Sequence, residues 1–274
     1  MASSETIDKS APAALHQVVN TWSPYSAVSQ ATRIRLRQLW ERLGFNHETA
    51  SKLRYEVDMV LLRTRCALGL AHRRQIRDLA SRHDLLVHLG CGNALLPGWI
   101  NMDCYPPQPA EGIEILTLDM RRGLPLPSGS VAAIFSEHFL EHLPMETVRG
   151  KILPEVRRVL EPGGTVRIGV PNGEYFVEQY VAYRAGERNT LFEKHRGGKT
   201  PMTMLNEIAH GFGHYFAYDF ETMASLLSDA GLTNISRRSP FDSDVEHFKG
   251  KDRVDEWRNA MTLYVEAEAP RRAE

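Results

Sequence analysis

The chain has 274 residues, of which 42% are hydrophobic and 24% are charged, and its formal net charge at pH 7 is −1. This composition is typical of a globular protein with a large core and excludes a disordered chain. No apolar run approaches the length of a membrane span, and no apolar leader follows a basic start, so the sequence predicts a cytoplasmic protein. The three cysteines, Cys66, Cys91 and Cys104, lack the spacing of a metal site or a disulfide framework, which agrees with a reducing compartment.

The first 84 residues divide into two predicted parts. Residues 1–25 contain several serines and prolines, which indicates a flexible leader. Residues 26–84 predict a helical cap, because apolar side chains recur at helical spacing over 28–43, 53–68 and 70–82. Packing on the outside of a sheet and an interface between two copies of the chain are the alternatives for this segment.

The amino-terminal part is mildly basic. Residues 1–84 carry 13 Lys and Arg against 8 Asp and Glu. A nucleic-acid surface usually shows a stronger basic stripe with aromatic residues between the charges, so solvated helix faces explain this balance better. We therefore expect no nucleic-acid partner; no membrane partner is expected either, and a homodimer is compatible with the sequence.

A predicted buried strand followed by a glycine turn organises the rest of the chain. Residues 85–89 are an apolar run, the pattern of a strand covered on both faces of a parallel sheet. Gly90 and Gly92 let the backbone turn tightly and approach a ligand, because no Cβ is in the way. A second strand over 99–103 ends in Asp103, whose carboxylate can accept hydrogen bonds from ribose hydroxyls. No full helix follows Gly92, so the turn predicts a nucleoside ligand without phosphates.

Two more predicted strands bring polar residues to the same edge of the sheet. After the strand at 113–118, Asp119 can accept a hydrogen bond from an adenine amino group, with Met120 against the ring. The strand at 131–135 is followed by Ser136, Glu137 and His138, and such strand ends face the ligand crevice. The predicted ligand contacts are His88, Gly90, Cys91, Gly92, Asn93, Asp103, Asp119, Met120, Ser136 and Glu137.

The carboxyl-terminal part continues the alternation of helices and strands. Residues 145–160 predict a helix and 165–170 a strand. Residues 172–218 form a long, irregular insertion with many aromatic and histidine side chains, and long ordered connections are often lids or binding loops. Asp219 predicts the cap of another helix. Two strands, near 234–238 and 261–267, complete the domain at 85–274.

Several motifs, taken together and in order, resemble the class I S-adenosylmethionine-dependent methyltransferases, and most closely the bacterial methyltransferase type 11 branch. The resemblance covers about 85–269 and implies a Rossmann-like, seven-stranded, mostly parallel sheet with helices on both faces, to which this chain adds an amino-terminal helical segment. It also implies S-adenosylmethionine as the cofactor. The motifs are HLGCG at 88–92, PGWIN and Asp103 at 97–103, LDM at 118–120, SEHFLEHL at 136–143 and LEPGG at 160–164.

Methyl transfer depends mainly on holding the nucleophile, the methyl carbon and the sulfur in line and on excluding water. An oxygen or amine nucleophile must also lose a proton, which a neutral histidine can accept. His138 is the first candidate for this role, ahead of His214 and His210. Tyr175 is a candidate to face the sulfonium through cation–π attraction. We expect a small-molecule acceptor in a biosynthetic pathway.

Other functions are compatible with parts of the sequence. The alternative to methyl transfer is an enzyme of the same frame that uses S-adenosylmethionine as its sole substrate. Such an enzyme catalyses a cyclisation, such as azetidine-2-carboxylate formation, or an elimination. His138, Glu141 and His142 match the H-x-x-E-H pattern of zinc peptidases, but a strand end is not where a metal-binding helix is expected, so we predict no metal. A glycosidase-like pair of Glu137 and Glu141 and a non-catalytic nucleoside binder have less support.

Overall fold

The computed structural model describes residues 42, 44, 47–106, 111–188, 190–253 and 255–271. The chain divides into two compact units, residues 1–60 and 61–274. The predicted leader at 1–25 and nearly all of the first predicted helix, at 28–43, lie outside the described residues. Of the helices that the structure describes, none is long and apolar enough to cross a membrane.

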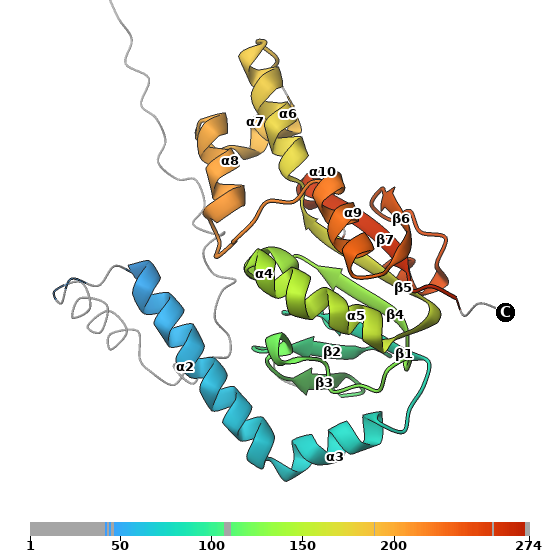
Figure 1. The fold of residues 1–274 in the computed structure, drawn as a ribbon. Coiled ribbons are helices and arrows are strands. Elements are labelled where there is room, and N and C mark those ends of the chain that lie inside the picture. Colours follow the sequence, from blue (N-terminus) through green and yellow to red (C-terminus); the bar gives the residue numbers. More distant parts are fainter. Residues whose placement is uncertain are drawn as a thin grey trace, which may run out of the picture. The chain divides into compact units, whose positions relative to one another are not determined.

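A seven-stranded sheet forms the centre of the second unit (Figure 1). Its order is β3-β2-β1-β4-β5-β7-β6; β1 to β5 are parallel, and β7 is antiparallel to both β5 and β6. The predicted Rossmann-like, mostly parallel fold class is confirmed. Strands β2 and β3 lie on one side of β1, and the chain then adds β4 and β5 on the other side. The point where the strand order reverses in this way is where open α/β sheets bind ligands. The strands are β1 (Leu85–Leu89), β2 (Ile100–Asp103), β3 (Glu114–Thr117), β4 (Val131–Glu137), β5 (Leu160–Pro171), β6 (Thr233–Arg238) and β7 (Thr262–Glu268).

Two helices precede the sheet, α2 (His47–Leu68) and α3 (Leu70–Leu79), so the second and third predicted helices are confirmed. The part of α2 from Leu61 onward belongs to the second unit. There, the Cys66 thiol donates to the carbonyl oxygen of Thr117 at 3.4 Å, at the end of β3. In α3, the Gln75 side chain donates to the Ile115 carbonyl oxygen at 2.9 Å. Both contacts attach this part of the chain to β3.

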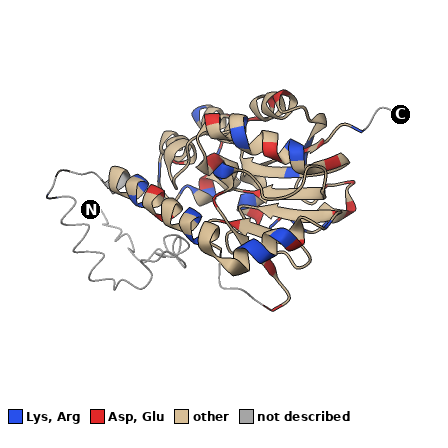
Figure 2. Cartoon of the chain, turned by 60° about the horizontal axis from the view of Figure 1, so that its bottom comes forward, with Lys and Arg blue, Asp and Glu red and all other residues tan. Residues whose placement is uncertain are grey.

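The helix predicted at 145–160 consists of α4 (Met145–Thr147), the π-helical η5 (Val148–Ile152) and α5 (Leu153–Val159). In Figure 1 it lies in front of the sheet together with α9 (Phe220–Asp229), whose N-cap is Asp219 as predicted. Apolar side chains of these helices and of the strands form the main core. In Figure 2 the strands are mostly tan, whereas charged residues lie mainly on helices and loops, as expected for a sheet covered on its faces.

The insertion at 172–218 is not irregular as predicted, because it folds into three helices: α6 (Gly173–Arg184), α7 (Leu191–His195) and α8 (Pro201–His210). Side-chain oxygens of Asn172, Thr190 and Thr200 accept backbone N–H groups at the three helix starts, which supplies the caps these helices need. A bridge between Asn172 and Tyr218 joins the two ends of the insertion, so it leaves and re-enters the sheet domain at one place.

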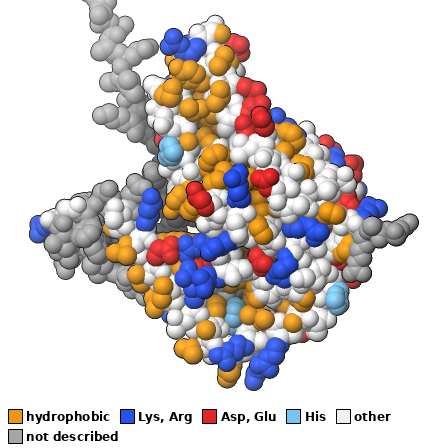
Figure 3. Space-filling view, in the orientation of Figure 1, with side chains coloured by type: hydrophobic (Ala, Val, Ile, Leu, Met, Phe, Trp, Pro, Cys, Tyr) orange, Lys and Arg blue, Asp and Glu red, His pale blue; other side chains and the backbone are white. Residues whose placement is uncertain are grey.

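The insertion has an apolar cluster of its own, made of Phe176, Phe192, Met204, Ile208 and Met261. Met261 ends the short helix α10 (Glu256–Met261), which the sequence analysis did not predict. On the face shown in Figure 3, hydrophobic side chains also gather over the insertion, and Val177, Val181 and Met202 are among the exposed hydrophobic residues. The insertion is therefore a small helical module that has both buried and exposed apolar side chains.

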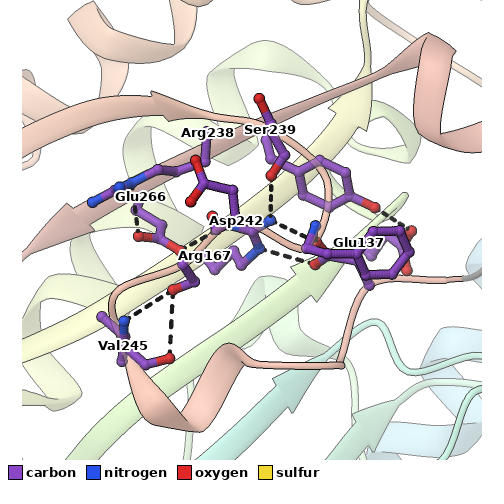
Figure 4. A network of polar contacts seen from close by, with 11 residues as sticks. Glu137, Arg167, Arg238, Ser239, Asp242, Val245 and Glu266 are labelled. Atoms are coloured by element: carbon purple, nitrogen blue, oxygen red, sulfur yellow. Dashed lines mark hydrogen bonds and ion pairs between the residues drawn. The ribbon is translucent and has the colours of Figure 1, made fainter.

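A buried polar network joins β5 to the segment between β6 and β7 (Figure 4). The Arg167 guanidinium is fully buried and binds both oxygens of Asp252, at 2.9 and 2.6 Å. It also donates to Glu266 at 2.7 Å and to the carbonyl oxygens of Asp242 and Ser239, both at 3.1 Å. This network ties the chain from 239 to 252, including the 3-10 helix η6 (Glu246–Phe248), onto the sheet.

Candidate functional site

The glycine turn after β1 is held against β2 and leaves open space on one side. The backbone N–H groups of Gly90 and Cys91 both donate to the Met102 carbonyl oxygen, at 2.9 and 3.1 Å. Gly90 has φ +68°, and a Cβ there would lie 2.4 Å from Phe139. Gly92 has φ +48°, but a Cβ there would meet nothing described within 4 Å. The turn thus requires glycine at Gly90 for packing, and at Gly92 it exposes backbone to whatever binds beside it.

Asp103 at the end of β2 stabilises this turn and keeps acceptor capacity. Its Oδ2 accepts the Gly92 N–H at 2.9 Å, and its Oδ1 accepts the Tyr105 N–H at 2.8 Å. A carboxylate offers about four lone-pair sites, so about two remain for ribose hydroxyls. Together with the open space beside Gly92, this carboxylate can accept hydrogen bonds from a ligand that carries hydroxyl groups.

Two neighbouring predicted contacts have different environments. Burial, and then the charge of Asp103, raise the pKa of the Cys91 thiol to about 12, so this side chain stays a neutral, packed thiol. Asn93 is exposed in the turn. Cys91 therefore contributes to the turn through its backbone N–H group, and its side chain is a packed, neutral thiol.

Asp119 lies at the end of β3, as predicted, but two arginines already bind its carboxylate. Arg63 of α2 donates to Oδ2 through Nε at 2.9 Å and Nη2 at 2.5 Å, and Arg121 donates to Oδ1 at 2.9 Å. Burial alone would raise the pKa of Asp119, but hydrogen bonds from Arg121 and Arg63 outweigh it and hold the pKa below its usual value. An adenine amino group can bind this carboxylate only if an arginine moves. Met120 beside it is buried in the main core.

His88 and Glu137 have structural partners. The buried His88 Nδ1 is 3.3 Å from the Asn101 Oδ1, and burial lowers the pKa of His88 to about 4. Glu137 accepts a hydrogen bond from the Tyr264 hydroxyl at 2.9 Å and lies 3.5 Å from Arg253. Ser136 is buried, and its hydroxyl finds no hydrogen-bond partner in the described part of the chain. The structure thus brings Gly90, Gly92 and Asp103 together, while His88 Nδ1 and the Glu137 carboxylate have structural partners.

A second polar group follows β4, which we call the Glu141 cluster: His138, Glu141, His142, His214 and Tyr218. Glu141 and His142 lie on the 3-10 helix η4 (Leu140–His142), and the insertion supplies His214. The His142 and His214 rings are 4.8 Å apart between centroids. Burial, and then the charge of Glu141, raise the pKa of the Tyr218 hydroxyl. The insertion is attached here as well, because the Tyr215 N–H donates to the Glu141 carbonyl oxygen at 2.7 Å.

His138 adopts a left-handed backbone conformation, with φ +53°, and both of its ring nitrogens have neighbours. Its Nε2 is 2.9 Å from Thr262 Oγ1, whose own hydrogen goes to the Arg258 carbonyl oxygen at 2.6 Å. Thr262 must therefore accept from His138, which assigns a proton to Nε2. The Nδ1 lies 3.2 Å from the Glu141 carboxylate. With the proton on Nε2, the Nδ1 of a neutral His138 presents a lone pair and cannot donate to Glu141.

His214 differs from His138, because one of its nitrogens is available. Its Nδ1 is 2.8 Å from the Ile208 carbonyl oxygen, which can only accept, so Nδ1 carries the proton and Nε2 presents a lone pair. Burial is the main cause that lowers the pKa of His214, which favours the neutral ring. Sequence reasoning named His214 but not its neighbours Glu141 and His142 as a group with it, because the insertion brings them together.

Tyr175 belongs to the aromatic interior of the insertion. Its ring contacts those of Phe176 and Trp257, with centroids 5.5 and 6.2 Å away. Burial raises the pKa of its hydroxyl. The described contacts of Tyr175 are therefore those of a packing residue, and its predicted role beside the sulfonium remains a prediction.

One family model and several solved structures are similar to this chain. Residues 100–168 match the family model described as "Methyltransferase domain". No curated protein matches the sequence. Solved structures similar to this chain include an S-adenosylmethionine-dependent methyltransferase from Mesorhizobium loti, with 17% identity, TM-score 0.40, and coverage of 73% of this chain and 98% of that one. An S-adenosylmethionine-dependent methyltransferase from Archaeoglobus fulgidus has 15% identity and TM-score 0.39, with coverage of 81% and 100%.

Proposed function

We propose that this chain is a class I S-adenosylmethionine-dependent methyltransferase and that it methylates an oxygen or nitrogen atom of a small molecule. The matched methyltransferase domain, the sheet order and the ordered motifs at the strand ends support this proposal. We further propose that the reaction is a step of a cytoplasmic biosynthetic pathway.

One observation carries the proposal: the glycine turn and the Glu141 cluster are neighbours. Phe139, which packs against Gly90, lies in the chain between His138 and Glu141. The nucleoside site and the polar cluster are therefore built on adjacent strands β1 and β4 and share one contact. Such a layout holds a cofactor on one side and an acceptor on the other.

The roles of the chain's own residues follow from their contacts. S-adenosylmethionine, when bound, supplies the activated methyl group. Gly92 admits it closely because the position of its Cβ is open, Gly90 keeps the turn packed against Phe139, and Asp103 accepts the ribose hydroxyls. The acceptor lies at the Glu141 cluster, where the His214 Nε2 lone pair and the Glu141 carboxylate can receive its proton. Methyl transfer there would form a bond from the acceptor atom to the methyl carbon as the carbon–sulfur bond breaks, with the electron pair of that bond kept by sulfur.

Replacing Asp103 with alanine should weaken S-adenosylmethionine binding. The loss of a hydrogen bond to a charged acceptor is worth roughly 1.5–3 kcal/mol, and the Gly92 N–H also loses its partner. Calorimetric titration should therefore show a dissociation constant about 10–100-fold higher. Asp219→Ala is a matched control, because it removes a helix cap outside the turn and should lower stability without changing affinity. Unchanged affinity in Asp103→Ala would remove this residue from the site.

We propose that the insertion at 172–218 and the part of the amino-terminal helices from Leu61 onward close over the site and exclude water. The attachment of Tyr215 to Glu141, and of Arg63 to Asp119, supports this role. Cofactor should then slow amide hydrogen exchange at 175–183 and 210–215, as measured by mass spectrometry. Tyr175→Phe should keep turnover near that of the wild type, since the ring remains, whereas Tyr175→Ala should lower it. Wild-type turnover and unchanged protection in Tyr175→Ala would contradict the lid assignment.

The function itself is tested by product analysis. Purified protein is incubated with S-adenosylmethionine and pools of hydroxyl- or amine-bearing small molecules, and mass spectrometry follows S-adenosylhomocysteine and products heavier by one methylene unit. An acceptor-dependent product supports the proposal. Consumption of S-adenosylmethionine without any acceptor, yielding other fragments, would contradict it.

A further inference from the structure

The Glu141 cluster contains a buried carboxylate that lacks hydrogen-bond donors. Glu141 is completely buried. Among the described residues, none donates a hydrogen bond to either of its oxygens, although His138 Nδ1 approaches Oε1 to 3.2 Å without good alignment. Burying a carboxylate is strongly unfavourable unless a cation or a set of donors compensates it. This position therefore favours a positive partner.

Two imidazoles lie where such a partner would bind. One ligand atom each from Glu141, His142 and His214 can be chosen so that all three lie within 4.8 Å of one another. His214 is already oriented, because its Nδ1 donates to the Ile208 carbonyl oxygen and leaves Nε2 free. Metal-binding histidines almost always donate their other N–H group to a carbonyl or carboxylate in this way.

The size and openness of the cluster suit a metal ion. Bonds from a metal to nitrogen and oxygen are about 2.0–2.2 Å long, so neighbouring ligand atoms of a tetrahedral ion lie about 3.4 Å apart. The three atoms lie within 4.8 Å of one another, so side-chain movements of up to about 1.4 Å would bring them to this separation. His142 is exposed and His214 is half-buried, which provides an entry path and leaves space for further ligands.

We propose that Glu141, His142 and His214 bind one divalent transition-metal ion, of the zinc or manganese kind, and that this ion binds a hydroxyl group of the methyl acceptor. Two histidines and one carboxylate are a donor set that leaves coordination positions open, and a bound hydroxyl loses its proton more easily. In this arrangement the lone pairs of His214 Nε2 and Glu141 bind the ion and no longer accept the proton, so the hydroxyl proton passes to solvent.

This assignment departs from the expectation of no metal at HFLEH. In the H-x-x-E-H pattern of peptidases both histidines are ligands. Here the group consists of Glu141, His142 and the distant His214, while His138 contacts the carboxylate from the side. The sequence pattern alone therefore points to a different set of ligands from the three residues that the structure brings together. The part of the ion in methyl transfer rests on the proposed function, whereas its binding does not.

The test uses the full chain without an affinity tag, treated with chelator and dialysed. Titration calorimetry with Zn²⁺ and Mn²⁺, elemental analysis after gel filtration, and the visible absorption of added Co²⁺ measure binding. We expect one ion per chain in the wild type. His142→Ala and His214→Ala should weaken binding by more than the roughly 10–100-fold that loss of an outer partner costs. His142 is exposed, so its replacement should leave folding intact.

His247→Ala is the matched control, because His247 is an exposed histidine on η6 outside the cluster and its variant should bind metal as the wild type does. S-adenosylmethionine affinity is measured in the same variants. Lost metal binding with retained cofactor binding supports the proposal. Binding of less than one ion per chain by the wild type, or equal binding by His142→Ala and His247→Ala, overturns it. Failure of the wild type to bind S-adenosylmethionine would count against the proposed function and leaves the metal result separate.

Discussion

Gly90→Ala should abolish S-adenosylmethionine binding and lower the melting temperature by on the order of 10 °C. The new Cβ would lie 2.4 Å from both Cβ and Cγ of Phe139, and the backbone fixes the position of Cβ, so side-chain rotation cannot relieve the clash. Overpacking of this kind costs typically 1–3 kcal/mol, and a left-handed conformation with a Cβ adds roughly 1–2 kcal/mol. At roughly 2–4 °C per kcal/mol, the two effects together account for the expected shift.

Gly92→Ala separates the effect on cofactor affinity from the effect on stability. Gly92 also has positive φ, but the position of its Cβ is open, so only the backbone strain of roughly 1–2 kcal/mol applies. The added methyl would stand in the space assigned to the cofactor, so affinity should fall by more than stability does. Thermal unfolding and calorimetric titration measure both quantities. A Gly90→Ala protein that melts like the wild type would show that Phe139 does not pack against the turn, and Phe139→Ala should partly rescue the Gly90→Ala variant if it does.

Much of the fold was predictable from local sequence patterns. Strand β1 was predicted at its observed bounds because an apolar run between polar residues and Gly90 can only be a short buried strand here. Asp219 was recognisable as an N-cap because its carboxylate precedes a periodic apolar segment. The antiparallel direction of β7 and the helices of the insertion were harder to predict. Helix α6, for example, has apolar residues on several sides.

The candidate site was predictable only where its residues lie directly at or after the end of a predicted strand. Gly90, Gly92 and Asp103 follow directly from the glycine turn and the end of the next strand. His214 meets Glu141 only because the insertion closes back at Tyr218, and a pairing at such separation leaves no periodic signal. The occupation of Asp119 by Arg63 is a tertiary contact of the same kind.

Arg167→Ala should destabilise the fold by roughly 3–5 kcal/mol, because it leaves the buried Asp252 carboxylate without its cation and Glu266 with Arg238 alone. Burial alone would lower the pKa of Arg167, but its hydrogen bonds to Asp252 and Glu266 raise it, so the guanidinium is held in its charged form. Arg167→Lys should fall between alanine and the wild type, since an ammonium keeps the charge and loses the two-pronged contact with Asp252. Urea unfolding followed by circular dichroism measures these differences.

Arg237→Ala provides the comparison, since it also removes an arginine–carboxylate pair, but one in which the Arg237 and Glu174 side chains are 48% and 43% exposed. An exposed pair contributes roughly 0–1 kcal/mol, so its loss should be barely measurable. Arg167 is outside the ligand site, and S-adenosylmethionine affinity should remain unchanged at temperatures where the variant is folded. Equal stability of Arg167→Ala and Arg237→Ala would mean that water or a rearranged Arg238, now 3.1 Å from Glu266, compensates the buried carboxylates.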